Sequence, residues 1–408
     1  MGAGLAGVTT AWELARDGHE VVVIERERQV ASASSFANGG IVAASRPFPW
    51  PSPQMPGTLF RALLGNEQAI RIRPQLDPGF WLWGLKFLAC CNERRHAEIL
   101  RHKARLVHYS QARLGELVAQ SGVDYHRLVN GVMYLYRDAA ALERGWQKAE
   151  AVRALGIVLE RLDPAGVAGR EPGVDRSRLA GAIYAPGDEA GDSAMFCREL
   201  ARRCERLGVV FRLNSEVLGL DSLDVTVKSV VTHAGRVLGD AFVCAMGVVD
   251  PRMRESLGAS LPIYPVKGYS ATVATARSEA MPRHAGMDES RLIAYCPLGD
   301  RIRITGGAEF AGYAKSHQPK DFARLYAAFG ELFPEAADFS AARTWACQRP
   351  MTPESTPRFG TGRFINLCFN VGHGHMGWAM AAGSARITAD LVSGRAPEID
   401  LEGLRIRN

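Results

Sequence analysis

Residues 2–26 read GAGLAGVTTAWELARDGHEVVVIER, and this stretch decides how the rest of the chain is interpreted. It opens on the pattern G-x-G-x-x-G. The apolar spacing from Leu5 to Arg16 predicts a helix that stops at Gly18, and HEVVVIE predicts a buried parallel strand that ends on Glu25. A glycine turn followed by a helix, a strand and a terminal acid is typical of a dinucleotide-binding unit.

Each part of this unit has a predicted role. Gly2 permits the tight turn, Gly4 lets backbone amides approach a pyrophosphate, and Gly7 lets the helix pack closely against the sheet. The amino end of the helix faces the phosphates, and the acid at the strand end accepts hydrogen bonds from a ribose 2′-hydroxyl. The predicted cofactor contacts in this unit are Gly2, Ala3, Gly4, Leu5, Ala6, Gly7, Glu25 and Arg26.

The unit lacks one part, because only Met1 precedes the glycines. In a doubly wound sheet the strand before the glycine turn is the central one, with a neighbour on each side. We expect about five apolar residues there, and their absence indicates a start assigned too late or a truncation. The sequence therefore predicts a glycine turn and helix docked near a sheet without its central strand, and weak cofactor binding.

Length and composition limit the class of protein. The chain has 408 residues, of which 47% are hydrophobic and 23% charged, as in a soluble globular protein of two domains. The net charge of +6 comes from scattered basic residues, so no nucleic-acid partner is expected. The eight cysteines never fall into C-x-x-C spacing and no signal peptide is present, which predicts no metal site and a cytoplasmic location.

The most apolar run is GFWLWGLKFLACC, from Gly79 to Cys91. It contains Lys86 and is shorter than the ~18 residues of a membrane span. We interpret it as a buried helix of a second domain. The alternative is contact with a membrane surface through exposed aromatic side chains.

Three later segments supply further candidate contacts with the cofactor. SSFANGGIVAAS, residues 34–45, is a small-residue loop that allows close backbone approach to a flat ligand. GDAFVCAMGVVD, residues 239–250, predicts a buried strand, and FINLCFNVGHGHMGW predicts a strand, a glycine loop and the start of a helix. The further predicted cofactor contacts are Asn38, Gly39, Gly40, Val217, Gly247, Gly372, His373, Gly374 and His375.

These pieces together resemble the bacterial D-amino-acid dehydrogenases, within the D-amino-acid oxidase-like FAD enzymes. The resemblance rests on the opening stretch, SSFANGG, APGDEAGD, PIYPVKGYS, RIRITGGAEFAG, RPMTPESTP and NVGHGHMGW, which occur in the family's order along the whole chain. It implies an α/β fold with a Rossmann-like, doubly wound FAD domain and an interleaved α+β substrate domain on a mixed or antiparallel sheet. The implied FAD domain comprises residues 1–50, 180–255 and 355–408, and the implied substrate domain comprises 51–179 and 256–354.

The resemblance also implies a reaction. Hydride passes from Cα of a D-amino acid to flavin N5, and water hydrolyses the imine to a keto acid and ammonia. Arg349 in CQRPMTP matches the arginine that binds substrate carboxylate in related flavoenzymes; the alternative is a structural arginine. Tyr269 shares a strand face with Lys267 and is a candidate substrate contact or a buried strand tyrosine.

Two motifs allow more than one interpretation of their role. His373 and His375 could suggest a metal, but no third ligand lies nearby in sequence, so we expect flavin contact through backbone amides. Cys347 is either a packed thiol or, as in sarcosine-oxidase-like relatives, a covalent flavin anchor. Asp188, Glu189 and Asp192 are interpreted as loop and cap groups, with Asp192 at a helix start.

The electron acceptor is also open. The first expectation is a quinone or other respiratory carrier, with peripheral contact to the inner face of the plasma membrane and a role in amino-acid catabolism. The alternatives are an oxidase that uses oxygen on glycine, sarcosine or hydroxyproline, and an inactive flavoprotein-like chain. The amino-acid side chain and the oligomeric state are not predicted.

Overall fold

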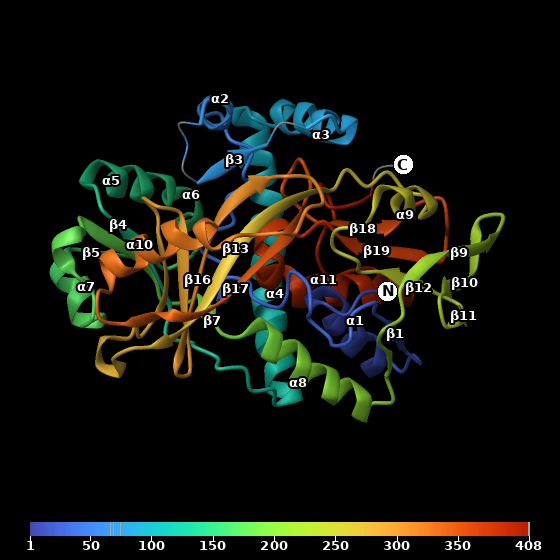
Figure 1. Cartoon of the computed structure of the whole chain (residues 1–408). Helices are drawn as coiled ribbons and strands as arrows, with labels where there is room; N and C mark the ends of the chain where they lie inside the picture. Colours follow the sequence, from blue (N-terminus) through green and yellow to red (C-terminus); the bar gives the residue numbers. More distant parts are fainter. Residues whose placement is uncertain (66, 68, 74, 407–408) are drawn as a thin grey trace.

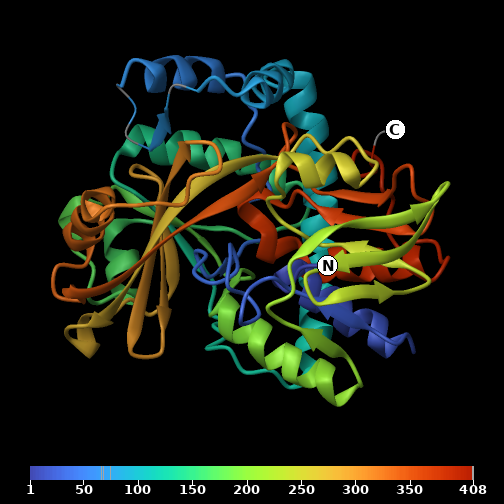
Figure 2. The same ribbon diagram turned by 45° about the vertical axis from the view of Figure 1, so that its right-hand side comes forward.

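The computed structural model describes residues 1–65, 67, 69–73 and 75–406. Two sheet systems lie on either side of the long helix α4 (Glu93–Ser121), as Figures 1 and 2 show from two directions. A large mixed sheet lies on one side. Smaller sheets and the helices that cover them lie on the other, together with the N-terminus.

The half that contains the N-terminus confirms the predicted α/β pattern. The helix Leu5–Arg16 forms as predicted, and the strand after it pairs in parallel with β8. The elements of this half are α1 (Leu5–Arg16), β1 (Val22–Ile24), α8 (Ser193–Arg206), β8 (Val210–Arg212), β9 (Val217–Leu223), β10 (Thr226–Thr232), β11 (Gly235–Leu238), β12 (Phe242–Cys244), α9 (Pro251–Ser256), β18 (Arg358–Thr361), β19 (Leu367–Val371) and α11 (Gly377–Val392). Asp192 caps α8 as predicted, because its carboxylate accepts from the N–H groups of Ala194 and Met195.

The parallel sheet of this half is interrupted in the middle. Strand β1 pairs with β8, β12 pairs with β19, and in the described part of the chain no strand lies between β1 and β12. Met1 and Gly2 bridge the two edges: the Met1 amino group donates to Val243 O at 2.8 Å, and Gly2 N donates to Ile24 O at 2.8 Å. Within the described chain, the glycine turn and its helix thus dock beside β1 and β12 with no strand between these two.

The other half is built on the large mixed sheet. Its strand order is β17-β13-β16-β15-β14-β4-β6-β5, and β3 pairs with β16. The elements of this half are β3 (Ile70–Ile72), β4 (Val132–Tyr136), α5 (Ala139–Lys148), α6 (Glu150–Arg153), β5 (Glu160–Leu162), α7 (Pro164–Arg170), β6 (Gly181–Ala185), β13 (Tyr264–Thr275), β14 (Ala285–Asp288), β15 (Ile293–Leu298), β16 (Arg301–Phe310), α10 (Ala323–Leu332) and β17 (Ala337–Met351). This is the mixed sheet expected for the substrate half.

The remaining helices and strands connect the two halves. The short strands β2 (Ile41–Val42) and β7 (Glu189–Ala190) pair with each other. Helices α2 (Met55–Leu63) and α3 (Pro78–Ala89) lie at the top of the molecule in Figure 1. Helix α4 packs its apolar face against α11, in the same core as α1 and α8, and β6 belongs to the large sheet. The division into two domains by residue ranges stays a prediction. Helix α4 and strand β6 each pack with the half to which those ranges do not assign them.

The interpretation of α3 as a buried helix is wrong. Only Trp83 and Phe87 of this helix are buried, while Trp81 is 58% and Leu85 66% exposed. The apolar composition predicted the helix correctly, but it contained no information on how many neighbours would cover it. Across the described residues, none of the helices combines the length and the apolar character needed to cross a bilayer.

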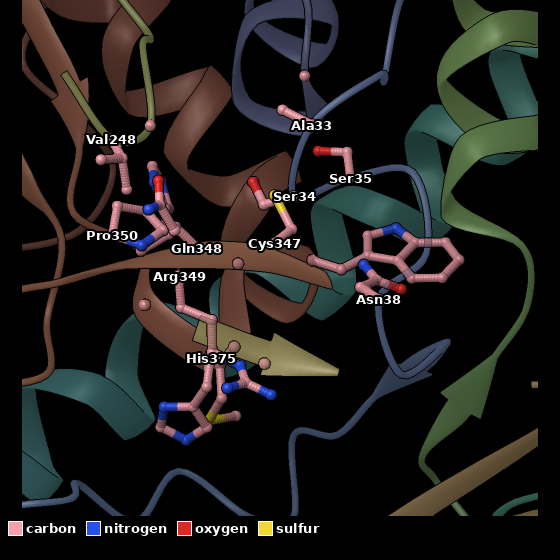
Figure 3. A pocket seen from close by; sticks show the side chains of 18 of the residues that line it. Ala33, Ser34, Ser35, Asn38, Val248, Cys347, Gln348, Arg349, Pro350 and His375 are labelled. Carbon is pink, nitrogen blue, oxygen red and sulfur yellow. The ribbon is translucent and has the colours of Figure 1, made fainter. Parts of the chain in front are cut away.

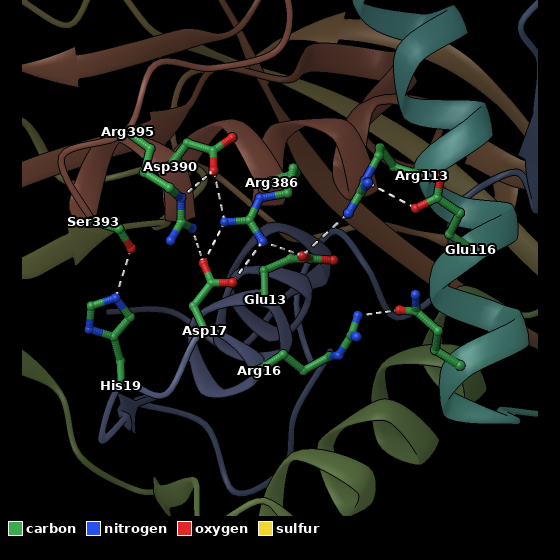
Figure 4. A network of polar contacts seen from close by, with 11 residues as sticks. Glu13, Arg16, Asp17, His19, Arg113, Glu116, Arg386, Asp390, Ser393 and Arg395 are labelled. Atoms are coloured by element: carbon green, nitrogen blue, oxygen red, sulfur yellow. Dashed lines mark hydrogen bonds and ion pairs between the residues drawn. The ribbon is translucent and has the colours of Figure 1, made fainter.

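A buried charge network joins α1 to α11 (Figure 4). Arg386 on α11 donates to Glu13 at 2.9 Å, to Asp17 at 3.2 Å and to Asp390 at 2.9 Å. Arg113 on α4 lies 3.7 Å from the same Glu13 carboxylate. The network fixes the helix that follows the glycine turn against the last helix of the chain.

We expect Arg386→Met to lower the free energy of unfolding by about 3 kcal/mol, because it leaves buried carboxylates without their shared cation. Urea denaturation followed by circular dichroism measures this. The matched control is Arg202→Met, which removes an exposed pair with Glu199 on α8 and is expected to cost less than about 1 kcal/mol. Equal losses in the two variants would contradict a special role for the network.

Candidate active site

A cavity of about 750 Å³ lies between the two sheet systems, within the size range of cofactor and small-molecule sites. The glycine turn of α1, the loop after β1 and the strands of the large sheet all contribute to its wall. Figure 3 shows part of this wall, with Arg349, Gln348 and Cys347 of β17 near the loop that contains Ser34 and Asn38. The cavity therefore brings together segments from both ends and the middle of the chain.

The glycine turn has the geometry that the motif requires. Gly2 has φ +96°, and a Cβ there would lie 2.8 Å from the carbonyl oxygen of Ala245. A Cβ on Gly7 would overlap the carbonyl oxygen of Gly2, so only glycine allows this helix to pack so closely. The N–H groups of Gly4 and Ala6 find no acceptor among the described residues. Both residues line the cavity, so these N–H groups are available to an anionic ligand.

Glu25 lies at the end of β1, on the cavity wall. Its carboxylate accepts from Ala3 N at 2.7 Å and from Glu27 N at 3.0 Å, which ties the strand end to the glycine turn. A second oxygen lone pair on each carboxylate oxygen remains for a ribose hydroxyl. Its contact with a ribose stays a prediction.

Most of the predicted cofactor contacts line the cavity, and four lie behind it. The lining residues are Gly2, Gly4, Leu5, Ala6, Glu25, Arg26, Asn38, Gly39, Val217, Gly247, His373, Gly374 and His375. Ala3, Gly7, Gly40 and Gly372 are not on the wall. They shape the turns that support it: Gly40 has φ +72° and packs against Cys296, and Gly372 has φ +81° beside Thr352.

Arg349 projects from β17 into the cavity. Its Nη1 donates to Gly307 O at 2.9 Å, and its guanidinium lies over Gly268, where a Cβ would collide with it. Among the described residues no carboxylate pairs with it. Burial lowers the pKa of Arg349 to about 10, so the group stays protonated at neutral pH. The arrangement leaves most of a guanidinium fork free for a carboxylate from a ligand.

Tyr269 lies on the same wall, but its hydroxyl is already engaged. It donates to the buried carboxylate of Glu309, which also accepts from Lys267 at 3.2 Å and from Arg73. Lys267 and Tyr269 thus lie on the same side of β13, as predicted. Burial would raise the pKa of Glu309, but the hydrogen bonds from Tyr269, Arg73 and Lys267 lower it below the ordinary value. The role of Tyr269 in substrate binding stays a prediction.

The two histidines of the glycine loop face different neighbours. His373 Nε2 lies 3.1 Å from Ser384 Oγ, and burial lowers the pKa of His373 to about 4. His375 stacks on Trp50 with 5.1 Å between ring centroids. Burial, together with Lys103 and Arg349, lowers its pKa well below the ordinary value. Both rings are therefore neutral at pH 7, and within the described chain no group of three metal-ligating side chains forms.

The sequence analysis missed several residues of the cavity wall. Ser35 could have been found, because it lies within SSFANGG, and its Oγ accepts from Leu5 N at 3.0 Å. Tyr134 and Ser270 line the cavity only because β4 and β13 join one large sheet. Long-range strand pairing of this kind leaves no pattern in either segment alone.

The glycine turn, the acid after the first strand and the cavity beside them define a dinucleotide-binding fold. The chain belongs to the DAO family of FAD-dependent oxidoreductases, whose model, described as FAD dependent oxidoreductase, matches residues 1–391. Relatives include D-amino acid dehydrogenase 2 of Mesorhizobium japonicum (39% identity, covering 99% of this chain and 98% of that protein). D-amino acid dehydrogenase of Agrobacterium fabrum is 38% identical over 100% of this chain and 98% of its own.

Solved structures show the same fold. Glycine oxidase from Geobacillus kaustophilus aligns with a TM-score of 0.76 at 21% identity, covering 100% of this chain and 97% of that one. L-proline dehydrogenase from P. horikoshii aligns with a TM-score of 0.74 at 18% identity, covering 97% and 92%. The chain is thus an oxidoreductase with the DAO-like fold, and its cofactor is FAD.

The wall of the cavity fits this cofactor. Buried polar atoms on it have no partner among the described residues, and such atoms are costly unless a ligand or water satisfies them. These atoms are Ser270 Oγ, Trp345 Nε1, Asn370 Oδ1, His375 Nδ1 and Trp378 Nε1. The N–H groups of the glycine turn would hold the pyrophosphate of FAD, and this cluster would contact its polar ring edges.

We expect the purified protein to release FAD, and neither FMN nor a covalent flavopeptide, on denaturation. Cys347 lines the cavity, but burial raises the pKa of its thiol, so the nucleophilic thiolate is disfavoured. Acid precipitation followed by chromatography of the supernatant measures the released flavin, and Cys347→Ser is the control. Yellow colour retained in the precipitated chain and lost in Cys347→Ser would contradict the expectation.

Proposed function

We propose that the chain oxidises D-amino acids to 2-keto acids and ammonia, as an FAD-dependent dehydrogenase. The observation that carries this proposal is Arg349: a protonated guanidinium in the cavity without a carboxylate partner among the described residues. An amino acid supplies the missing carboxylate. The full-length relatives at 36–39% identity named D-amino acid dehydrogenase support the D configuration.

The residues of the chain have separate tasks in this reaction. FAD, when bound, accepts the hydride from substrate Cα. Arg349 binds the substrate carboxylate with its free fork and so orients Cα. Its positive charge disfavours a second cation nearby, which lowers the pKa of the substrate ammonium and favours the neutral amine that reacts. The neutral rings of His375 and Trp50 exclude water from this part of the cavity without adding charge.

We further propose a membrane-soluble quinone as the electron acceptor and the outer face of α2 and α3 as a peripheral membrane contact. This face exposes large apolar side chains: Phe60, Leu63, Leu64, Leu76, Trp81, Leu82, Leu85 and Leu88. The exposed cations Arg61, Lys86 and Arg94 accompany them. Apolar and aromatic side chains bordered by cations are typical of helices that lie in a membrane interface. Met55, at the start of α2, lines the cavity, so this face adjoins the site.

A turnover assay tests the reaction and the electron acceptor, and a vesicle sedimentation assay tests the membrane contact. With D-alanine and a soluble quinone the enzyme should form pyruvate and ammonia in equal amounts, and hydrogen peroxide in air should stay a minor product. In sedimentation with vesicles that contain anionic lipid, the wild type should pellet with the vesicles, and Leu85→Glu should stay in the supernatant. Peroxide as the main product would favour an oxidase. Equal sedimentation of both proteins would contradict the proposed membrane contact.

A further inference from the structure

Strand β16 contains a β-bulge where it lines the cavity. The register shifts between Lys267 and Tyr269 of β13, so that Gly307 and Ala308 of β16 lie opposite the single residue Gly268. Gly307 has φ +74°, a left-handed conformation typical of the glycine in such bulges. The other edge of β16 changes its partner from β15 to β3 at the same point. Bulges beside active sites re-aim particular groups, so the partners of this bulge indicate what it does.

The bulge holds the side chain of Arg349. The carbonyl oxygen of Gly307 accepts from Arg349 Nη1 at 2.9 Å, and the N–H of Ala308 donates to Ala69 O, just before β3, at 2.9 Å. The guanidinium lies over Gly268, where a Cβ would collide with it. The extra residue in β16 and the glycine opposite it therefore set the direction in which the Arg349 fork points.

A buried carboxylate ties the two strands together around the bulge. Glu309 is 1% exposed, and its Oε2 accepts from the Tyr269 hydroxyl and lies 3.2 Å from Lys267 Nζ. These two residues are the ones on β13 between which the register shifts. The other oxygen, Oε1, accepts from Arg73 Nε, directly after β3. One side chain of β16 thus contacts β13 on both sides of the bulge and also the segment that follows β3.

The ring of Tyr269 connects this carboxylate to the bulge. A Cβ on Gly307 would lie 3.2 Å from Tyr269 Cδ2, so the ring packs directly beside this glycine. The ring also belongs to the apolar core that includes α10. Because Glu309 fixes the hydroxyl and the core fixes the ring, Gly307 has little room to move. Its carbonyl oxygen therefore stays where it meets Arg349.

We propose that Glu309 is a positioning residue for the substrate carboxylate, which fixes the bulge so that the Gly307 carbonyl keeps the free fork of Arg349 directed into the cavity. This inference rests on the role of Arg349 in the proposed function. Glu309 is not on the cavity wall and acts through its neighbours. An arginine that is oriented in advance loses less freedom on binding than one that the ligand must order. Loss of Glu309 should therefore weaken carboxylate binding more than it slows the oxidation.

The first test uses propionate, which has a carboxylate but no amine to be oxidised. Its Kd for the FAD-loaded protein is measured from the change in flavin absorbance. We expect Glu309→Gln to raise this Kd about tenfold, because one amide oxygen cannot accept from all three donors and the bulge loosens. Lys267→Met combined with Glu309→Gln removes the ammonium left without its carboxylate and should show the same rise with a smaller loss of stability.

The matched control is Glu171→Gln. Glu171 is also a buried carboxylate of the large-sheet half, and it accepts from the N–H groups of Arg283 and His284. This variant should lose stability but keep the wild-type Kd for propionate. A Kd that is unchanged in both Glu309 variants, or raised equally in Glu171→Gln, would overturn the inference.

A double-mutant cycle tests the route through Arg349. With D-alanine, Glu309→Gln should raise KM about tenfold and change kcat less than about twofold. In the Arg349→Ala background the same substitution should have no further effect on kcat/KM, because the residue through which it acts is gone. A further tenfold loss in that background would overturn the inference. If no D-amino acid reduces the flavin, the proposed function fails, and the propionate measurements still decide the role of Glu309.

Discussion

Arg349→Ala is expected to lower kcat/KM for D-amino acids by roughly 10²- to 10³-fold, which corresponds to about 3–4 kcal/mol. Among the described residues no carboxylate balances this guanidinium in the cavity, so its loss is expected to remove the main attraction for the substrate carboxylate. In the proposed reaction the same contact orients Cα, and we therefore expect kcat to fall as well as KM to rise. Steady-state kinetics with FAD content matched between proteins measures the effect.

Two further variants make this prediction specific. Arg349→Lys should recover little activity, because an ammonium cannot grip both carboxylate oxygens as a guanidinium does. Arg343→Ala, which removes an exposed arginine on the same strand, should retain wild-type kinetics. If kcat/KM in Arg349→Ala equals that of the wild type, Arg349 is a structural residue that satisfies the carbonyl of Gly307.

Adding six to eight residues of the pattern Met-x-Val-Ile-Val-Ile ahead of Gly2 is expected to raise soluble yield and FAD content severalfold. The edges of β1 and β12 are bridged only by Met1 and Gly2 within the described chain. A strand between them would pair with both, and each new backbone hydrogen bond contributes about 1 kcal/mol. It would also move the terminal amino group, whose pKa burial lowers, out of the sheet into water.

The comparison uses the chain with and without this extension, expressed in parallel. Soluble yield and flavin absorbance per mole of protein are the two readouts. A matched extension of alternating glycine and serine, which cannot form a stable strand, should give no gain. Equal flavin content in all three proteins would show that Met1 and Gly2 already hold the pyrophosphate turn in place.

The sequence predicted the parts of the site that depend on local backbone geometry. Gly2, Gly4 and Gly7 were assigned roles that follow from glycine conformation, and the structure places them in the predicted turn. The helix Leu5–Arg16 and the cap at Asp192 were predicted for the same reason. Each depends on residues that are close together along the chain.

The parts that were missed or wrong depend on long-range packing. The contact of Arg46 with Tyr134 was not predicted, because these two residues meet only after β4 joins the large sheet. The exposure of α3 was mispredicted because an apolar helix has the same sequence whether a neighbour covers it or not. The engagement of Tyr269 by Glu309 was missed because their strands, β13 and β16, pair through a bulge.

Anaerobic mixing of the FAD-loaded protein with single enantiomers tests the central claim most directly. A D-amino acid should bleach the oxidised-flavin absorbance in the mixing chamber, and the matching L-amino acid should leave it unchanged over the same period. The amount of keto acid formed should equal the amount of flavin reduced. Flavin that stays oxidised with every D-amino acid tried, or that is bleached equally by L-enantiomers, would contradict the account.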